Sequence, residues 1–230
     1  MLPLRSMSEL LRVQSDFDRI ARLLETRGEQ DEPYDRFLLR QVPSPCERLL
    51  EVGSGPGRMA RLLSKRTGRV TGIDASPQMV SLASARTPSG DNAHFICADF
   101  MTHDFGGERF DCVFSVTTFH HMSNAPALER MKTLLAPGGV LIVHDVRAVT
   151  GTRDLVASGL RATATGEILH WVAQRMRNRG ELARAWHDHG ATDEYLDMAG
   201  VRALCAAHLP GAHIFNHPLW RYTIIWNGRL

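Results

Sequence analysis

The stretch LLEVGSGPGRMA, at residues 49–60, constrains the fold of this chain more than any other feature. An apolar run that carries one acid, Glu51, leads directly into three alternating glycines, Gly53, Gly55 and Gly57. Glycine adopts backbone angles, and permits close approach by a ligand, that a Cβ atom would block. Open α/β sheets bind their ligands beyond the carboxyl ends of their strands. The stretch therefore predicts a strand followed by a ligand-binding loop, the alternative being a tight turn without a ligand.

From Arg48 onward, short apolar runs alternate with helical segments. Such alternation favours a parallel sheet covered by helices on both faces. The last two runs are separated by only a few residues, which suits an antiparallel hairpin. We predict an α/β fold, a doubly wound, mostly parallel seven-stranded sheet with an antiparallel last strand. The predicted strands are 48–53, 69–74, 93–97, 110–116, 140–146, 212–216 and 221–226, and the helices between them include 58–66, 77–86 and 125–135.

Composition excludes several classes of protein. The chain has 230 residues, 43% of them hydrophobic, and a net charge of +2, which is too mild to indicate a nucleic-acid partner. No window approaches a membrane span, and the N-terminus lacks the apolar region of a secretory signal. The four cysteines are scattered, which argues against a disulfide framework or a zinc site. We expect Cys97 and Cys112 to be small core residues and the setting to be the cytoplasm.

Two further acids follow the next two predicted strands. Asp74 ends the second strand, where a carboxylate can accept hydrogen bonds from both hydroxyls of a ribose. Its alternative role is to cap the turn before Ser76. Asp99 and Phe100 follow the third strand, where an acid could accept from an adenine amino group while an aromatic ring stacks nearby. A solvated loop acid is the alternative for Asp99. Together these groups favour a nucleoside ligand.

The glycine spacing separates two nucleotide cofactors. The dinucleotide fingerprint G-x-G-x-x-G carries its third glycine where this chain has Arg58. A Tyr-x-x-x-Lys pair is also missing from the sequence. S-adenosylmethionine has no phosphate, and it needs an amino-acid site, a ribose contact and an adenine slot. Glu51 is positioned to attract the ammonium group of its methionine tail.

These motifs resemble those of class I S-adenosylmethionine-dependent methyltransferases. LLEVGSGPGRMA resembles that family's first motif, GIDASPQMV its second, ICADF its third and FDCVFSVTTFHHM its fourth, followed by LLAPGGVLIVHDV. The resemblance covers roughly residues 48–147, is strongest to small-molecule enzymes of bacterial metabolism, including secondary metabolism, and implies a Rossmann-like fold. The cofactor contacts that it implies are Glu51, Gly53, Ser54, Gly55, Asp74, Ala75, Met79, Asp99, Phe100, the backbone near Ser115, and Tyr34, for which simple packing is the alternative.

The resemblance also implies an organisation for the chain. We expect one methyltransferase domain over residues 1–230. Within it, 1–45 would form an N-terminal helical lid that includes helices at 6–27 and 32–41, and 46–150 the cofactor-binding core. Residues 151–208 would form a helical insertion, and 209–230 the closing hairpin.

Histidines supply the candidate catalytic groups. His120 and His121 follow the fourth strand, where they could act on the acceptor, with His120 favoured because it is nearer the strand end. His144 and Asp145 end the fifth strand, and alternation turns one away from the other. The H-x-H pair at 187–189 resembles a metal site, but no third ligand has useful spacing, so we predict no metal. The candidate substrate-binding residues are His120, His144, Trp171 and His187.

The predicted function is S-adenosylmethionine-dependent transfer of a methyl group to an O or N atom of a small organic molecule. In-line displacement depends mostly on proximity, with help from a histidine base where the acceptor must lose a proton. Alternatives are a protein or RNA methyltransferase, a nicotinamide-dependent oxidoreductase, and a non-catalytic binding homologue. We expect a small-molecule acceptor as partner, no nucleic acid and no membrane, and the sequence leaves a homodimer open.

Overall fold

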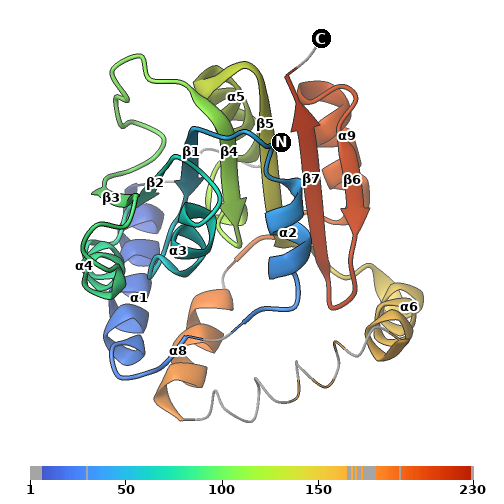
Figure 1. The fold of residues 1–230 in the computed structure, drawn as a ribbon. Helices are drawn as coiled ribbons and strands as arrows, with labels where there is room; N and C mark the ends of the chain where they lie inside the picture. Colours follow the sequence, from blue (N-terminus) through green and yellow to red (C-terminus); the bar gives the residue numbers. More distant parts are fainter. Residues whose placement is uncertain are drawn as a thin grey trace.

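The computed structural model describes residues 7–29, 31–164, 167, 169, 172, 180–191 and 193–228, and its centre is a seven-stranded sheet (Figure 1). The strand order is β3-β2-β1-β4-β5-β7-β6. The strands are β1 (Arg48–Val52), β2 (Arg69–Asp74), β3 (Ala93–Cys97), β4 (Phe110–Val116), β5 (Leu135–Val146), β6 (His213–Asn216) and β7 (Arg221–Asn227).

The pairing confirms the predicted sheet. Strands β1 to β5 pair in parallel, whereas β7 is antiparallel to both β5 and β6. The short connection between β6 and β7 permits only a hairpin, since parallel neighbours need a long crossover. Strand β5 begins at Leu135, before the predicted residue 140, because Leu135 pairs with Phe110 ahead of a register shift.

Helices cover both faces of the sheet. In Figure 1, α2 and α3 lie in front of the sheet and α5 and α9 lie behind it. The N-terminal helices are shorter than the predicted ranges 6–27 and 32–41. The helices are α1 (Met7–Leu24), α2 (Asp35–Gln41), α3 (Arg58–Ser64), α4 (Pro77–Arg86), α5 (Asn124–Leu134), α6 (Gly151–Ala164), α8 (Glu181–Gly190) and α9 (Met198–His208), with a short 3-10 helix η1 (Phe119–His121).

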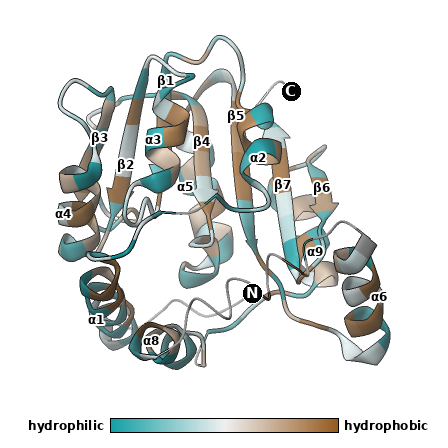
Figure 2. Ribbon diagram, turned by 60° about the horizontal axis from the view of Figure 1, so that its bottom comes forward, coloured by the Kyte–Doolittle hydropathy of each residue, from teal (hydrophilic) through white to brown (hydrophobic). Residues whose placement is uncertain are grey.

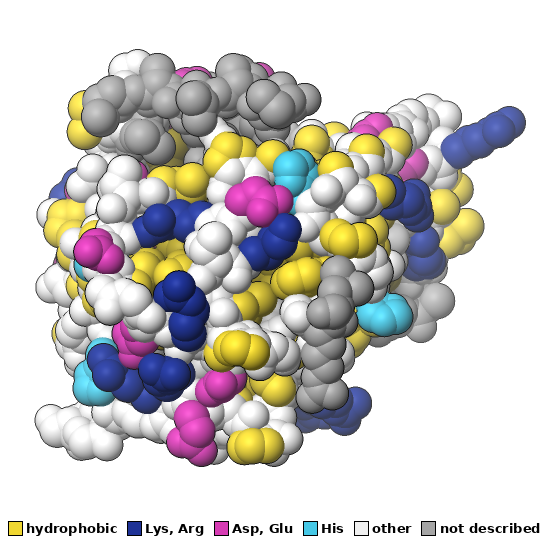
Figure 3. All heavy atoms as spheres, turned by 90° about the horizontal axis from the view of Figure 1, so that it is seen from above, with side chains coloured by type: hydrophobic (Ala, Val, Ile, Leu, Met, Phe, Trp, Pro, Cys, Tyr) yellow, Lys and Arg dark blue, Asp and Glu magenta, His cyan; other side chains and the backbone are white. Residues whose placement is uncertain are grey.

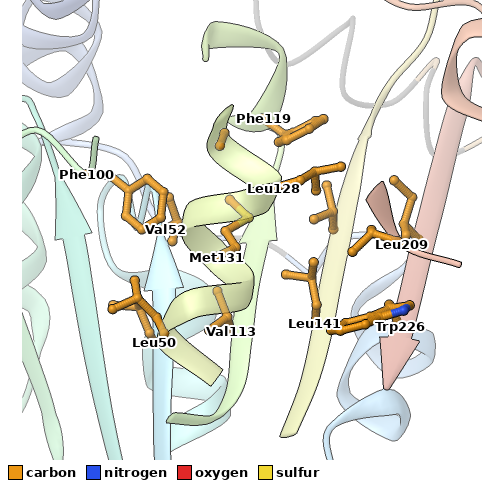
Figure 4. Packing of buried hydrophobic residues seen from close by; sticks show 14 of the residues in the cluster. Leu50, Val52, Phe100, Val113, Phe119, Leu128, Met131, Leu141, Leu209 and Trp226 are labelled. Carbon is orange, nitrogen blue, oxygen red and sulfur yellow. The ribbon is translucent and has the colours of Figure 1, made fainter. Parts of the chain in front are cut away.

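Alternation along the strands builds a core on each face. Leu49 packs on the side of α2 and α3, whereas its neighbour Leu50 packs on the side of α5 and α9. The second of these cores includes Leu128 and Met131 of α5 and Trp226 of β7, which Figure 4 shows together with Leu50. The sheet is therefore buried on both faces, and only its two edges and its strand ends remain for a ligand.

The parallel strands all point toward one end of the molecule, where α1, α8 and α6 lie (Figure 2). Apolar residues of α1, α4 and α8 pack together there, among them Ile20, Met79 and Leu182. The opposite end, shown in Figure 3, carries Lys and Arg side chains interspersed with Asp and Glu. No described helix is long and apolar enough to cross a membrane.

The prediction for the cysteines was half wrong. Cys112, in the middle of β4, is buried as expected. Cys97 is exposed. It is the last residue of β3, an edge strand, so neither a second neighbouring strand nor a following strand residue covers it.

Candidate functional site

The glycine loop joins β1 to α3, and its three glycines serve different purposes. All three have positive φ, at 72° for Gly53, 50° for Gly55 and 76° for Gly57. A Cβ atom on Gly53 would lie 2.2 Å from the Thr118 side chain, whereas one on Gly55 would meet nothing within 4 Å. Gly53 is therefore required by protein packing, and Gly55 leaves bare backbone facing open space, as the predicted cofactor site needs.

Asp74 holds this loop from the end of β2. One carboxylate oxygen accepts from the Gly55 N–H at 2.8 Å and the other accepts from the Ser76 N–H at 2.9 Å. The turn-capping role that we considered as an alternative is thus observed, and it leaves lone pairs on both oxygens. Burial raises the pKa of Asp74, and the two N–H donors oppose that shift. The carboxylate therefore lies beside the open backbone of Gly55, at the position where we expect the ribose of the cofactor to bind.

Glu51 of β1 and Ser54 of the glycine loop are buried polar residues. Within the described structure, Glu51 Oε2 and Ser54 Oγ are buried and have no hydrogen-bond partner. Burial, followed by the charge of Asp74, raises the pKa of Glu51 to about 8. A buried carboxylate oxygen without a partner is costly unless a cation or donor reaches it. An ammonium group fits this need, so the loop fits the methionine tail of the predicted cofactor.

The other predicted cofactor residues lie in varied settings. Ala75 and Asp99 are exposed at the strand ends, with Asp99 Oδ1 accepting from the Met101 N–H at 2.9 Å. Ser115 is fully buried, and its hydroxyl donates to the Val52 carbonyl at 3.1 Å. The side chain of Met79 packs with apolar residues of α1 and α8.

Phe100 differs most from its predicted setting. Its ring is buried in the core beside α5 (Figure 4), and the Arg130 guanidinium lies 5.3 Å from the ring centre. The chain turns after β3, and the Phe100 side chain packs into the core on the face of the sheet that α5 and α9 cover. The structure therefore does not present the Phe100 ring on the open edge, where stacking on an adenine was expected.

The segment after β4 joins the glycine loop to the predicted histidines. Thr117 has a φ of 52°, an unusual angle for a β-branched residue. Thr118 donates to the Gly53 carbonyl at 3.3 Å, and η1 follows at once with His120 and His121. The histidines are therefore tied through Thr118 to the loop that fits the cofactor.

His120 is held by Asp145 of β5. Its Nδ1 lies 2.6 Å from Asp145 Oδ1, and its backbone N–H donates to Asp145 Oδ2 at 2.7 Å. Because an ionised carboxylate only accepts, Nδ1 carries the proton and the ring turns Nε2 away from Asp145. This contact fixes the orientation of the His120 imidazole.

Three other segments bring groups to the same place. Asp193 lies between the histidine rings, with Oδ2 3.7 Å from His120 Nε2 and Oδ1 3.5 Å from His121 Nδ1. His189 of α8 has its Nε2 3.3 Å from His121 Nε2 and its Nδ1 3.3 Å from Oδ2 of Asp16 in α1. We name this set the His120 cluster: Asp16, His120, His121, Asp145, His189 and Asp193.

Charge differs sharply between the two adjacent histidines. Burial lowers the pKa of His120, but the Asp145 carboxylate outweighs it and raises that pKa to about 9. Burial lowers the pKa of His121 to about 4. For Asp193, the effect of burial is outweighed by the two imidazoles, which hold its pKa well below the usual range. At neutral pH, His120 is therefore charged and His121 is neutral.

His144 lies on the other face of the sheet, as alternation predicts for the neighbour of Asp145. Its Nδ1 is 2.8 Å from Thr223 Oγ1, which His217 Nε2 also contacts at 2.8 Å. The ring of Tyr34 lies 4.9 Å from that of His144, and its hydroxyl donates to the Pro218 carbonyl at 3.1 Å. Burial lowers the pKa of His144 well below its usual value. Tyr34 thus contacts the β6–β7 turn, the packing alternative for this residue.

His187, like His144, is not brought to the cluster. His187 is exposed on α8, while His189 of the same helix is buried and faces His121. Trp171 lies outside the described residues. Sequence reasoning passed over Asp16 and Asp193, whose only signal is that each is an acid within the two segments predicted to cover the site.

Known proteins are similar to this chain in sequence. Residues 49–139 match the family of methyltransferase domains. The chain is 30% identical over 197 residues to an uncharacterized methyltransferase of Mycobacterium tuberculosis, covering 84% of this chain and 93% of that protein. It is 23% identical over 193 residues to a ubiquinone biosynthesis O-methyltransferase of Cereibacter sphaeroides, covering 83% and 73% respectively.

Solved structures agree on the fold. The N-methyltransferase NodS from Bradyrhizobium japonicum, in complex with S-adenosyl-L-homocysteine, aligns with a TM-score of 0.65 at 17% identity, covering 95% of this chain and 99% of that one. At that identity the likeness concerns the fold, which in NodS holds the demethylated form of the cofactor that the glycine loop fits.

Proposed function

Because this chain belongs to the class I S-adenosylmethionine-dependent methyltransferases, we propose that it methylates an O or N atom of a small organic molecule at the His120 cluster. One observation carries the proposal. The Thr118 side chain, which Gly53 leaves room for, begins the short segment that presents His120 and His121. The imidazoles of His120 and His121, which could orient or deprotonate an acceptor, therefore follow directly after a residue that contacts the glycine loop.

The cofactor supplies a methyl group on a sulfonium whose departure leaves a neutral thioether, so no departing anion needs stabilisation. The protein's task is to fix positions, which can supply much of the rate enhancement. Glu51 and Ser54 would hold the methionine tail, Gly55 would admit it against the main chain, and Asp74 would accept from the ribose. Asp99 would accept from the adenine amino group.

Burial of the cluster supports a small acceptor. His120 and His121 are 6% and 7% exposed, and the Asp193 side chain is 2% exposed. Helices α1 and α8 would have to move for any acceptor to reach the cluster, and a compact molecule requires a smaller movement than a side chain or base on a macromolecule. This argues for a small acceptor over protein or RNA.

The electrostatics favour His121 over His120 as the base. His120 is charged at neutral pH because of Asp145, so it has no lone pair with which to take a proton. His121 is neutral, and its Nδ1 is buried without a hydrogen-bond partner among the described residues. His121 would accept the proton of an O–H or N–H acceptor while His120 orients it.

Two segments cover the cluster, and we propose that they act as its lid. Helix α1, from the N-terminal 1–45 segment, contributes Asp16, and the 151–208 segment contributes His189 and Asp193. Phe17 of α1 packs edge-on against His189, with ring centres 4.6 Å apart. These segments would open to admit the acceptor and close to exclude water.

The relatives support acceptors of this kind. One is named for O-methylation in ubiquinone biosynthesis, and NodS is titled an N-methyltransferase. A panel of phenols, hydroquinones, carboxylates and amines therefore covers the expected chemistry.

The test is incubation of the purified chain with methyl-labelled S-adenosylmethionine and each member of this panel. We expect labelled product and stoichiometric S-adenosylhomocysteine from at least one member, and roughly 10–150-fold less from Asp74→Ala at the same low cofactor concentration. Label that enters only protein or RNA from a cell extract would contradict the proposal. Thermal stabilisation by NAD but not by S-adenosylmethionine would contradict the cofactor itself.

A further inference from the structure

We propose that the His120 cluster binds one divalent transition-metal ion, of the zinc or ferrous type, through His120 Nε2, His121 Nδ1 and the Asp193 carboxylate. These three residues offer ligand atoms that all lie within 4.8 Å of one another. The sequence offered only the H-x-H pair on α8 and no third ligand. The folded chain supplies a different set, with its third ligand far along the sequence from the other two.

Proton positions within the cluster favour a cation. His189 Nδ1 faces the Asp16 carboxylate and must donate to it, so in the neutral ring Nε2 accepts. His121 Nε2 lies 3.3 Å from that acceptor and therefore carries the proton of its own ring. The lone pair of His121 is then on Nδ1, which faces Asp193 Oδ1 across 3.5 Å. A lone pair facing a carboxylate is repulsive unless a positive ion lies between them.

Because both atoms are buried, bulk water cannot relieve the repulsion between His121 Nδ1 and Asp193 Oδ1. Among the described residues, His121 Nδ1 and Asp193 Oδ1 are both buried and both lack a hydrogen-bond partner. Asp145, which is fully buried, adds a second negative charge to the cluster. Without an ion, the charged His120 ring compensates only one of these two carboxylates, whereas a divalent ion that displaces the His120 Nε2 proton would compensate both.

The separations match ligands around an ion better than hydrogen bonds. Zinc bonds to nitrogen and oxygen are about 2.0–2.2 Å, which places two tetrahedral ligand atoms about 3.4 Å apart. The Asp193 oxygens lie 3.5 and 3.7 Å from the two imidazole nitrogens. Elsewhere in the same cluster, where a proton is shared, the His120–Asp145 distance is 2.6 Å.

Each ligand also has the outer support typical of metal sites. The second nitrogen of His120 is bonded to Asp145, and that of His121 faces His189, which in turn faces Asp16. The Tyr195 hydroxyl donates to Asp193 Oδ2 at 3.2 Å. Such contacts fix the tautomer and orientation of ligating histidines.

The chemistry of the ligands selects the ion. Imidazole nitrogens suit zinc, iron and similar ions, whereas magnesium prefers oxygen ligands. Three protein ligands leave at least one position open, as in catalytic sites. In methyl transfer, the ion's charge would lower the pKa of an acceptor O–H or N–H group bound there, so that its proton would pass to water rather than to His121; this part alone rests on the proposed function.

Calorimetry on the untagged, chelator-treated chain tests the site with Zn²⁺, Co²⁺ and Mg²⁺ as probes. We expect one Zn²⁺ or Co²⁺ per chain, a Co²⁺ visible spectrum of a nitrogen and oxygen site, and no comparable binding of Mg²⁺. Asp193→Asn should weaken binding by more than about 100-fold, and Asp16→Asn, which acts through His189, by about 10–100-fold. His94→Ala removes an exposed histidine of β3 and should change nothing.

S-adenosylmethionine binding by each variant shows that it has folded, and keeps this test separate from that of the function. Absence of one-to-one binding in the unaltered chain would overturn the site. So would binding that survives Asp193→Asn, or that His94→Ala weakens equally, since the ion would then be adventitious. Ion binding at full affinity in a chain that methylates nothing would overturn the proposed function and leave the site standing.

Discussion

The cofactor edge and the His120 cluster lie at the same end of the sheet but are assembled in opposite ways. The cofactor edge takes its groups from the ends of successive strands, with Glu51, Asp74 and Asp99 each following an apolar run. The His120 cluster draws on α1, η1, β5, α8 and the residues after α8. The fold itself fixes the first, whereas the helices that cover the strand ends determine the second. This division explains how one fold can keep one cofactor and change its acceptor.

The two regions also treat buried acids differently. Glu51 has no imidazole beside it, and burial raises its pKa to about 8. Asp193 lies between two imidazoles, which hold its pKa well below the usual range despite burial. At neutral pH the carboxyl group of Glu51 is thus mostly protonated and would ionise when a cation binds, whereas the carboxylate of Asp193 is ionised already. Variants in the two regions should therefore fail in different measurements.

The largest expected effect is on turnover, from His120→Ala. Removal of a group that orients the acceptor or holds its ion should lower kcat by about 10²–10⁴-fold, the usual range for such groups. The dissociation constant of S-adenosylmethionine should stay within about twofold, because Thr118 and not His120 contacts the glycine loop. Calorimetry with the cofactor and the labelled-methyl assay measure the two quantities. Equal turnover in both proteins would remove His120 from the reaction.

The next largest effect separates two glycines of one loop. Gly53→Ala forces a Cβ against Thr118 at a φ of 72°, and we expect the free energy of unfolding to fall by about 2–4 kcal/mol. Gly55→Ala meets open space, so only the unfavourable φ should matter, at about 1–2 kcal/mol. Urea unfolding measures both. The matched pair should differ in stability, yet both should bind the cofactor poorly; normal binding by Gly55→Ala would place the cofactor elsewhere.

Asp74→Ala should have a smaller effect, confined to the cofactor edge. The lost charge-assisted hydrogen bonds are worth about 1.5–3 kcal/mol, which corresponds to roughly 10–150-fold weaker S-adenosylmethionine binding. Saturating cofactor should restore most of the turnover, in contrast to His120→Ala. An unchanged dissociation constant by calorimetry would remove Asp74 from the binding site.

Sequence reasoning reached the fold and the cofactor edge because both depend on local patterns. Apolar runs and their spacing determine the strands, and the carboxyl ends of parallel strands must meet at one edge. The His120 cluster depends on which helix faces turn inward. His187 and His189 differ by two positions, about 200° around a helix, so they face opposite ways. Only the packing of α8 against α1 decides that His189 is the buried one.

Residues beyond the strand ends escaped prediction for a related reason. The turn that follows β3 carries the Phe100 ring under the sheet, and no local signal indicates its direction. Asp193 is one acid among several in the 151–208 segment, and only its contacts with the histidines of η1 distinguish it from the others. Alternation did separate His144 from Asp145 correctly, but only the structure shows that Asp145 is the one facing His120.

A pH dependence of stability is expected from Glu51 at the cofactor edge. The pKa of Glu51 is about 8 in the folded chain and near 4.5 when unfolded, so the folded state binds more protons between these values. The contribution of Glu51 to the free energy of unfolding is therefore fully present below pH 4.5. It is lost as the pH rises toward 8, by up to about 1.4 kcal/mol per pH unit. Glu51→Gln cannot titrate and should show a flatter curve over pH 5–8 in urea unfolding.

The same group should make cofactor binding depend on pH in the opposite direction. An ammonium group pairs with the ionised carboxylate, so affinity for S-adenosylmethionine should rise as pH approaches 8 and protons should be released on binding. Calorimetry in two buffers of different ionisation enthalpy detects that release. Glu51→Gln should bind more weakly and release none. Parallel stability curves and equal proton release in the two proteins would show that Glu51 is ionised throughout this pH range. The two regions would then not differ in the ionisation of their buried acids.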